Sequence, residues 1–284
     1  PSNLTMTFPP QFACDSEFVK LMTRAPDVDL TTAALELARD AYPLLDFDSV
    51  HGWIDDVADE LVRSINLADS EEEALSLLRN SLAGTHELNG SREAYETPDG
   101  SFLNRIIESR RGIPIGLSVL YIAVAQKVGL NLQGVSAPGH FLTRYESLDG
   151  PLFVDPFCSG NILSYEEAVC RVQKMTMLSS DQAEEALEPV EPRPIILRML
   201  NNLKALYARL GKWTAAWVVQ HRIACLCPSA YSEKRDLALI SLRANRTGQA
   251  IDLLESCLPS CPCDERELLE GQLKVARKEL VRWN

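Results

Sequence analysis

GIPIGLSVLYIAVAQKVG, residues 112–129, carries the strongest signal for a buried helix in this chain. Residues 115–128 are strongly apolar, and Gly129 is a residue type that commonly follows a helix end. Before them, Arg110 to Pro114 breaks the preceding helical pattern, and proline suits the first turn of a helix. The stretch therefore predicts one buried helix that begins near Pro114.

Two strand-like segments, residues 132–145 and 151–156, follow this helix. A hairpin with the four-residue loop Glu146–Asp149 places His140 opposite Asp155. Directly paired residues point to the same face of a sheet, with Cβ atoms about 4.5–5.5 Å apart. An imidazole beside a carboxylate is the orienting half of a catalytic triad, although a histidine in a lone strand is more often structural.

A triad also needs a nucleophile at the start of the apolar helix, where the helix N-terminus acidifies a thiol. Pro114 occupies that position and offers neither a nucleophile nor a backbone N–H. Ser118 lies one turn further along and is expected to be packed, whereas Cys158, after Asp155, could approach the cleft. An enzyme would therefore depend on Cys158 or on a water activated by His140.

Arg110 and Arg111 precede the turn at Gly112 and could bind an anion or a carboxylate in the cleft. An arginine holds a carboxylate through two parallel hydrogen bonds, which suits it to this role. The alternative, which we favour, is that one of them pairs with Glu108 or with a helix C-terminus.

The chain divides into four stretches. Residues 1–100 and 195–284 are predicted to be helical, residues 101–176 combine helices with strands, and residues 177–194 are acidic and proline-rich. At about 150 residues per domain, the length predicts two domains. We expect residues 1–100 to belong to the core domain of residues 101–176, residues 177–194 to be a linker, and residues 195–284 to form an all-α domain.

The C-terminal stretch repeats weakly with a period of 34 residues. Three residues and their equivalents one period later are Leu203 and Leu237, Ala216 and Ala250, and Cys227 and Cys261. A two-helix unit of this length is typical of the tetratricopeptide repeat, although Ser241 stands where the second unit should carry an aromatic residue like Tyr207. The alternative is an antiparallel helical bundle with an accidental period. In either case Leu206, Trp213 and Trp217 are expected to pack between helices.

The run LNRIIESRRGIPIGLSVLY, residues 103–121, together with Pro138-Gly-His140-Phe-Leu and Asp155-Pro-Phe, resembles the SirB-type family. Proteins of that family join a transglutaminase-like core, related to papain-type cysteine peptidases, to tetratricopeptide-like helices. They occur in bacteria and in plastid-bearing eukaryotes. The resemblance covers about residues 25 to 270.

The resemblance implies an α+β fold, in which one main helix packs on a small antiparallel sheet, with N-terminal helices and a C-terminal all-α repeat domain. His140 and Asp155 match the histidine and aspartate of the enzymes. Pro114 stands where the enzymes have cysteine, which is typical of this family. The residues that we expect near the cleft are Asn104, Arg110, Arg111, Ser118, Tyr121 and Cys158.

The composition limits the classes of partner. Lys and Arg number 28 against 40 Asp and Glu, and the resulting net charge of −12 repels nucleic acid and anionic membranes. No apolar run reaches the roughly 18 residues of a membrane helix, so we expect no membrane insertion. The glycine-rich loops that bind nucleotides are missing from the sequence, and we expect no cofactor.

Eight cysteines in a chain of this length are too few for a disulfide scaffold, and they favour a soluble protein in a reducing compartment. The pairs Cys225-Leu-Cys227 and Cys261-Pro-Cys263 could supply four thiolates to zinc, but the spacing favours core packing and free thiols, and we expect no metal. The family's distribution implies a bacterial cytoplasm or a plastid stroma. The first residue is proline, which fits a trimmed chain or a mature form.

Two functions remain open. The first is a protein-binding or regulatory protein, whose degenerate cleft keeps His140 and Asp155 and whose helical repeats present a concave surface to a protein or peptide. The second is a hydrolase or acyltransferase that uses the same pair with a nonstandard nucleophile such as Cys158. Pro114 favours binding, since acyl transfer loses two of its elements together. The sequence leaves the oligomeric state open.

Overall fold

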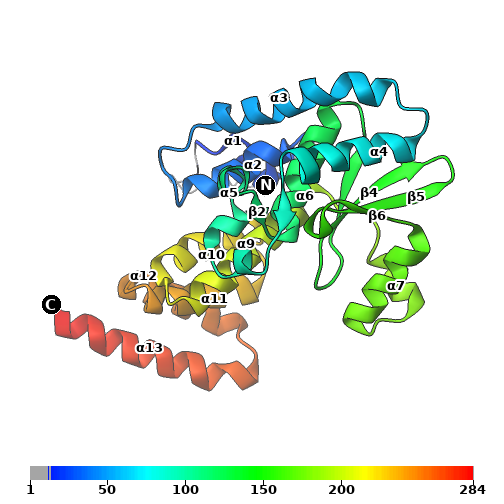
Figure 1. Cartoon of the computed structure of the whole chain (residues 1–284). Helices are drawn as coiled ribbons and strands as arrows, with labels where there is room; N and C mark the ends of the chain where they lie inside the picture. The colour runs from blue at the N-terminus through cyan, green and yellow to red at the C-terminus, as the bar shows by residue number, and fades with distance from the viewer. Residues whose placement is uncertain (1–11, 13, 284) are drawn as a thin grey trace, which may run out of the picture. The chain divides into compact units, whose positions relative to one another are not determined.

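The protein forms two compact units, Pro1–Met199 and Leu200–Asn284. The structure is a computed structural model and describes residue 12 and residues 14–283. The first unit combines helices with small sheets, and the second is helical in its described part (Figure 1). The boundary falls within a single helix, α9 (Pro192–Arg209). This is the predicted α+β fold with a helical C-terminal region.

The elements of the first unit alternate between helices and short strands. Its helices are α1 (Ser16–Thr23), α2 (Leu30–Arg39), α3 (Phe47–Asn66), α4 (Glu71–Arg79), α5 (Leu103–Ser109), α6 (Pro114–Lys127), α7 (Tyr165–Thr176) and α8 (Ser180–Glu185). Its strands are β1 (Asn89–Gly90), β2 (Arg111–Gly112), β3 (Leu132–Val135), β4 (Leu142–Ser147), β5 (Gly150–Asp155) and β6 (Asn161–Leu163). Short helical turns are η2 (Asn80–Thr85), η3 (Glu93–Tyr95), η4 (Pro98–Ser101) and η5 (Pro156–Cys158).

Helix α6 lies at the centre of this unit. It begins at Pro114, as predicted, and all residues from Pro114 to Tyr121 are buried, because apolar side chains surround the helix. It packs against helices α2, α3 and α5 and against strands β3 and β4 of an antiparallel sheet with the order β3-β4-β5-β6. In the described part of the chain, neither α6 nor any other helix has the length and apolarity needed to cross a membrane.

The β4–β5 hairpin is tighter than the sequence predicted. Ser147 pairs with Gly150, so the loop is Leu148–Asp149 and the prediction of a four-residue loop was wrong. The register therefore shifts by two residues, and His140 precedes β4 instead of pairing within it. Side chains of a strand alternate between its two faces, so a shift of two residues preserves the face that each side chain occupies.

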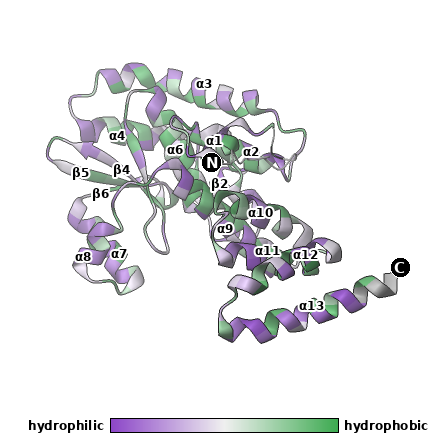
Figure 2. Cartoon of the chain, turned by 180° about the vertical axis from the view of Figure 1, so that it is seen from behind, coloured by the Kyte–Doolittle hydropathy of each residue, from purple (hydrophilic) through white to green (hydrophobic). Residues whose placement is uncertain are grey.

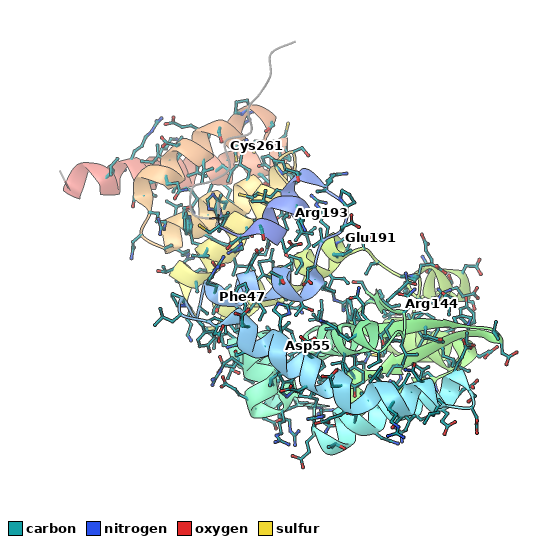
Figure 3. All side chains as sticks on the ribbon, turned by 90° about the horizontal axis from the view of Figure 1, so that it is seen from above. Phe47, Asp55, Arg144, Glu191, Arg193 and Cys261 are labelled. Carbon is teal, nitrogen blue, oxygen red and sulfur yellow. The ribbon has the colours of Figure 1, made fainter. Side chains whose placement is uncertain are left out.

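Residues 177–194 do not form an open linker, and that prediction was wrong. Ala183 and Leu187 are fully buried in a cluster with Val135 of the sheet. Arg144 of β4, labelled in Figure 3, donates a hydrogen bond to the carbonyl oxygen of Leu187. The segment was predicted to be a linker because its composition is acidic and proline-rich. Its apolar side chains Ala183 and Leu187 nevertheless pack against the first unit.

Consecutive helices of the second unit pack against one another. They are α10 (Trp213–Leu226), α11 (Tyr231–Arg243), α12 (Thr247–Cys257) and α13 (Cys263–Trp283), with the short turn η6 (Leu258–Ser260) after α12. Hydrophilic and hydrophobic stretches alternate along α13, as expected for a helix with one covered face (Figure 2). Leu269, Leu273 and Ala276 form that covered face.

The residues of the 34-residue period occupy equivalent places. Ala216 and Ala250 lie in the first turns of α10 and α12, and both are fully buried. Ser241, which replaces the expected aromatic residue, accepts a hydrogen bond from Trp217 Nε1 at 3.1 Å. Membership of the tetratricopeptide class stays a prediction.

Two glycine substitutions test how tightly the first unit is packed. A Cβ atom at Gly90 would lie 2.3 Å from the ring of Phe157 and 2.4 Å from its carbonyl oxygen, whereas a Cβ atom at Gly52 of α3 meets nothing within 4 Å. Gly90→Ala is expected to lower the free energy of unfolding by about 1–3 kcal/mol through overpacking. Gly52→Ala, the matched control, is expected to raise it by about 0.5–1 kcal/mol because alanine favours helix. Urea unfolding of both variants measures the difference, and equal effects would contradict the packing described at Gly90.

Candidate functional site

The carboxylate of Asp155 is the centre of the site. Asp155 ends β5 and is fully buried. Its Oδ2 lies 2.9 Å from Nε2 of His140 and also contacts the guanidinium of Arg171 on α7. Its Oδ1 accepts a hydrogen bond from the backbone N–H of Cys158 at 3.2 Å, which caps the turn η5. One buried carboxylate thus contacts the loop before β4, the turn η5 and helix α7.

These contacts control the charge of Asp155. Burial by itself would raise the pKa of this carboxyl, but His140, the side chain of Cys158 and Arg171 favour the ionised form and hold the pKa below its ordinary value. The carboxylate is therefore ionised at neutral pH. The ring of His140 is close enough for an ion pair, although Nε2 is not aligned for a well-formed hydrogen bond.

A second arginine fixes the loop that carries His140. Arg198 on α9 donates hydrogen bonds of 2.8 Å to Ser136 Oγ and to the carbonyl oxygens of Ala137 and His140. Its guanidinium also lies 5.6 Å from the ring centre of Phe141. Arg198, in the first half of α9, therefore helps to fix the position of the His140 ring.

An open groove of about 810 Å³ runs past the pair of His140 and Asp155. Its walls come from η3, the loop before β4, the turn η5 and helix α7. The ring of Phe157 lies between two others, with its centre 6.0 Å from that of His140 and 6.1 Å from that of Tyr95. The site thus has an apolar wall beside its charged centre.

Cys158, the alternative nucleophile, lies on the wall of this groove and is exposed. Burial of its thiol raises its pKa, and the neighbouring carboxylate of Asp155 raises it further, although Arg171 acts in the opposite direction. The thiolate is the reactive form of cysteine, so this environment makes Cys158 a poor nucleophile at neutral pH.

The structure does not bring the other sequence-predicted residues to the groove. Pro114, Ser118 and Tyr121 are buried along α6, and Asn104 is buried on α5. None of these four lines the groove. The hydroxyls of Ser118 and Tyr121 have no hydrogen-bond partner within the described residues, and burial raises the pKa of Tyr121.

Arg110 and Arg111 also lie away from the groove. Arg110 forms an ion pair with Glu87, and Arg111 donates a hydrogen bond to the carbonyl oxygen of Glu87. Both therefore help to hold the segment around Glu87. We expected a partner in this region, but it is Glu87 rather than Glu108.

Sequence reasoning missed the arginines at the centre of the site. Arg171 follows Asp155 by 16 residues, and Arg198 contacts a carbonyl oxygen 58 residues away. Neither separation matches a local motif. The only signal for Arg171 was its position on the half-buried helix of residues 165–176. Arg198 lay just beyond the segment that was predicted to be a linker.

No group of three or more histidine, cysteine, aspartate or glutamate side chains is arranged to hold a metal ion among residues 12 and 14–283. Within these residues, the two Cys-x-Cys pairs do not form such a group either. The site combines an imidazole, a carboxylate and an arginine beside an apolar wall.

Arg198→Met tests the role of this arginine in placing His140. Methionine keeps the long side chain over Phe141 but leaves the carbonyl oxygens of the loop without their donor, at an expected cost of about 1–3 kcal/mol. Amide hydrogen exchange of residues 136–141 should accelerate more than exchange elsewhere in the first unit. Arg63→Met, an exposed change on α3, is the control and should alter neither stability nor exchange. Unchanged protection of the loop in Arg198→Met would contradict this role.

The sequence is similar to that of known proteins over most of its length. A family model described as the transglutaminase-like superfamily matches residues 48–201. A UPF0162 protein of Xylella fastidiosa strain 9a5c is 36% identical over 236 residues, which cover 79% of this chain and 81% of that protein. The SirB1 protein of Salmonella typhimurium is 25% identical over 235 residues, which cover 79% of this chain and 87% of that protein.

A more distant similarity joins a part of the chain to a mammalian protein. F-box only protein 21 of Mus musculus is 28% identical over 130 residues, which cover 43% of this chain and 20% of that protein. No solved structure matches the chain significantly. The family model spans more than half of the sequence and the bacterial relatives align over most of it, so the chain belongs to the SirB-type family of transglutaminase-like proteins.

Proposed function

We propose that this protein binds a segment of a partner protein in the groove beside His140 and Asp155, and that it acts as a regulatory or adaptor protein rather than as an enzyme. The observation that carries the proposal is the start of α6. Pro114 is the first residue of that helix, at the position where the resemblance to the enzymes puts their cysteine. Proline has no nucleophile and no backbone N–H for an oxyanion, so acyl transfer lacks two of its parts.

The environment of Asp155 also favours binding. In a triad, the aspartate serves to orient and stabilise the imidazolium. Here the same carboxylate oxygen contacts both His140 and Arg171, and the arginine already compensates its charge. The carboxylate therefore orients and stabilises the imidazole less strongly than the aspartate of a triad does. A water activated by His140 would lack this support as much as a thiol would.

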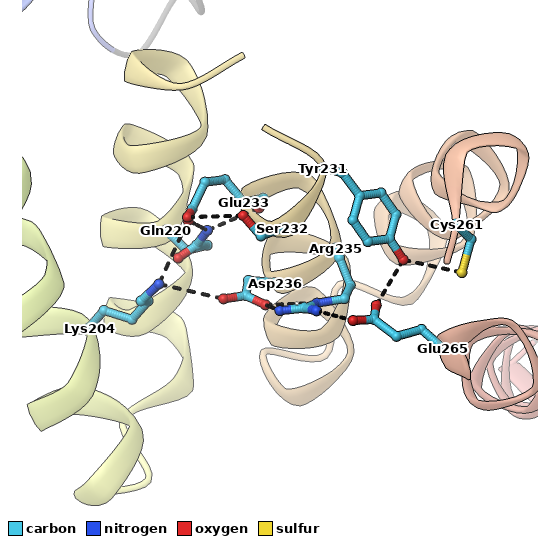
Figure 4. Close-up of polar contacts among 9 residues, drawn as sticks. All are labelled: Lys204, Gln220, Tyr231, Ser232, Glu233, Arg235, Asp236, Cys261 and Glu265. Atoms are coloured by element: carbon cyan, nitrogen blue, oxygen red, sulfur yellow. Dashed lines mark hydrogen bonds and ion pairs between the residues drawn. The ribbon is translucent and has the colours of Figure 1, made fainter. Parts of the chain in front are cut away.

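The second unit supplies a rigid helical surface for a partner. Lys204 contacts Glu233 and Asp236 of α11, and Asp236 in turn pairs with Arg235 (Figure 4). Arg235 also pairs with Glu265 at 2.5 Å, which connects α11 to α13. Chains of charge-assisted contacts of this kind hold neighbouring helices in fixed positions. Stacked helices held in this way suit recognition of a protein rather than of a small molecule.

Enzymatic assays test the absence of catalysis. The wild type is expected to show no transglutaminase, peptidase or esterase turnover above that of His140→Ala, because Pro114 stands in place of the nucleophile at the start of α6. Cys158→Ser is expected to behave in the same way, since the raised pKa of the Cys158 thiol disfavours its reactive form. Wild-type turnover that disappears in both His140→Ala and Cys158→Ser would establish the alternative, a hydrolase or acyltransferase that uses Cys158. Turnover lost only in His140→Ala would indicate an activated water.

Site-specific photo-crosslinking tests where a partner binds. A photoreactive residue at Tyr95, on the wall of the groove, should form a crosslink to a discrete partner in native extract. The same residue at Leu44 or Leu148, which are 98% and 96% exposed and lie outside the groove, should not. Equal crosslinking at all three positions would contradict binding in the groove.

A further inference from the structure

We infer that the groove takes a short acidic peptide segment with an apolar anchor. The anchor lies against Tyr95, Phe157 and Met175, and a carboxylate of the segment meets Arg92 and Lys174. This inference rests on the proposed function, because it names the chemistry of the segment that the groove binds. It is carried by the exposed apolar side chains of the groove and by two basic side chains there that make no ion pair or side-chain hydrogen bond with another described residue.

The apolar wall of the groove is exposed. Tyr95 and Met175 lie on it and are 42% and 52% exposed, and Phe157 fills the space between Tyr95 and His140. Met177, 96% exposed, follows directly after α7. Large apolar side chains that gather on one surface commonly mark a binding site. Methionine adapts its shape to a partner, and aromatic rings offer a large rigid contact area.

The acidic side chains of the groove already make polar contacts within the protein. Asp155 contacts His140 and Arg171, as described above. Glu166 Oε2 lies 3.0 Å from Ser164 Oγ, and Glu167 Oε2 accepts a hydrogen bond from the backbone N–H of the same serine. Both glutamates therefore belong to the N-terminal cap of α7, where the helix dipole stabilises negative charge.

Two positive charges of the groove have no such partner. Arg92 and Lys174 are exposed on its wall, and neither forms an ion pair or a side-chain hydrogen bond with another described residue. Both side chains are positively charged in a chain whose net charge is −12. The complementary ligand therefore carries negative charge close to an apolar group.

The size and character of the groove favour a peptide over a free anion. A volume of about 810 Å³ is far more than a carboxylate or a phosphate fills. Inorganic phosphate would use Arg92 and Lys174 but would leave Tyr95, Phe157 and Met175 in water. A peptide segment with one large apolar residue beside an aspartate or glutamate satisfies both parts of the wall at once.

Selection from a phage-displayed heptapeptide library on the full-length protein tests this chemistry. The enriched peptides should carry an acidic residue next to or one position away from a large apolar residue. A synthetic peptide with the most enriched sequence should bind about tenfold more tightly than its version with amides in place of the carboxylates. Enriched peptides without acidic residues, or equal affinity of the acid and amide versions, would overturn the inference. So would the absence of any enrichment.

Charge reversal assigns the binding to the groove. The double variant Arg92→Glu and Lys174→Glu should weaken binding of the acidic peptide by about tenfold and leave the amide version unchanged. The double variant Arg63→Glu and Lys274→Glu, two exposed reversals outside the groove, is the control with the same change in net charge and should change neither. Met175→Ser should weaken both peptides, because it removes part of the apolar wall. Equal losses in the groove variant and in this control would mean that only the net charge matters, which overturns the inference.

Two further outcomes separate this inference from the proposed function. Inorganic phosphate that displaces the peptide completely and depends on Lys174 would assign the cations to a free anion instead. A crosslink from Tyr95 to a partner, unaffected by the double charge reversal, would keep the proposed function and overturn the acidic chemistry. Peptide binding that follows the variants as expected, without a crosslink from Tyr95 in extract, would support the peptide site and count against the proposed cellular role.

Discussion

The buried carboxylate of Asp155 is the interaction on which this structure depends. An ionised carboxylate that is fully removed from water is strongly destabilising unless other groups compensate it. His140, Arg171 and the N–H of Cys158 do so, and they come from the loop before β4, from α7 and from η5. Apolar packing also joins α7 to the sheet, through Val169 and Val172 beside Phe153. The groove lies where the three elements surround this charge, so contacts that help to stabilise the fold also define the site.

This origin explains why a triad-like pair can persist without catalysis. The contact between His140 and Asp155 contributes to stability whether or not a nucleophile stands nearby, since it is one of the contacts that offset the burial of this carboxylate. The pKa of Asp155 is held below its ordinary value, and that group therefore adds stability that is complete above its unfolded pKa, near 4. The contribution is lost as the pH falls through the lower pKa of the folded state. At neutral pH the ion-pair centre is intact, and Pro114 at the start of α6 does not disturb it.

The sequence predicted local features better than long-range ones. The helix that begins at Pro114 follows from its apolar run. His140 and Asp155 are neighbours despite the wrong register, because His140 lies in the loop just before β4 and Arg198 holds that loop. Arg198 could not be found, since no periodicity relates a residue of α9 to a carbonyl oxygen 58 positions earlier. The segment of residues 177–194 was taken for a linker because composition outweighed Ala183 and Leu187, which only the folded sheet shows to be buried.

The net charge of −12 gives the two cations of the groove a role in selectivity. Over distances beyond the Debye length of about 8 Å, salt screens most of the repulsion between this chain and an acidic ligand. At contact, Arg92 and Lys174 act at short range beside a low-dielectric apolar wall, where a charge pair is worth more than in open water. A ligand whose negative charges are spread over a wide area is repelled by the whole acidic surface of this chain. Only the two cations of the groove offset that repulsion. A ligand that concentrates its charge beside an apolar side chain gains both contacts, and the groove therefore discriminates by the arrangement of negative charge rather than by its amount.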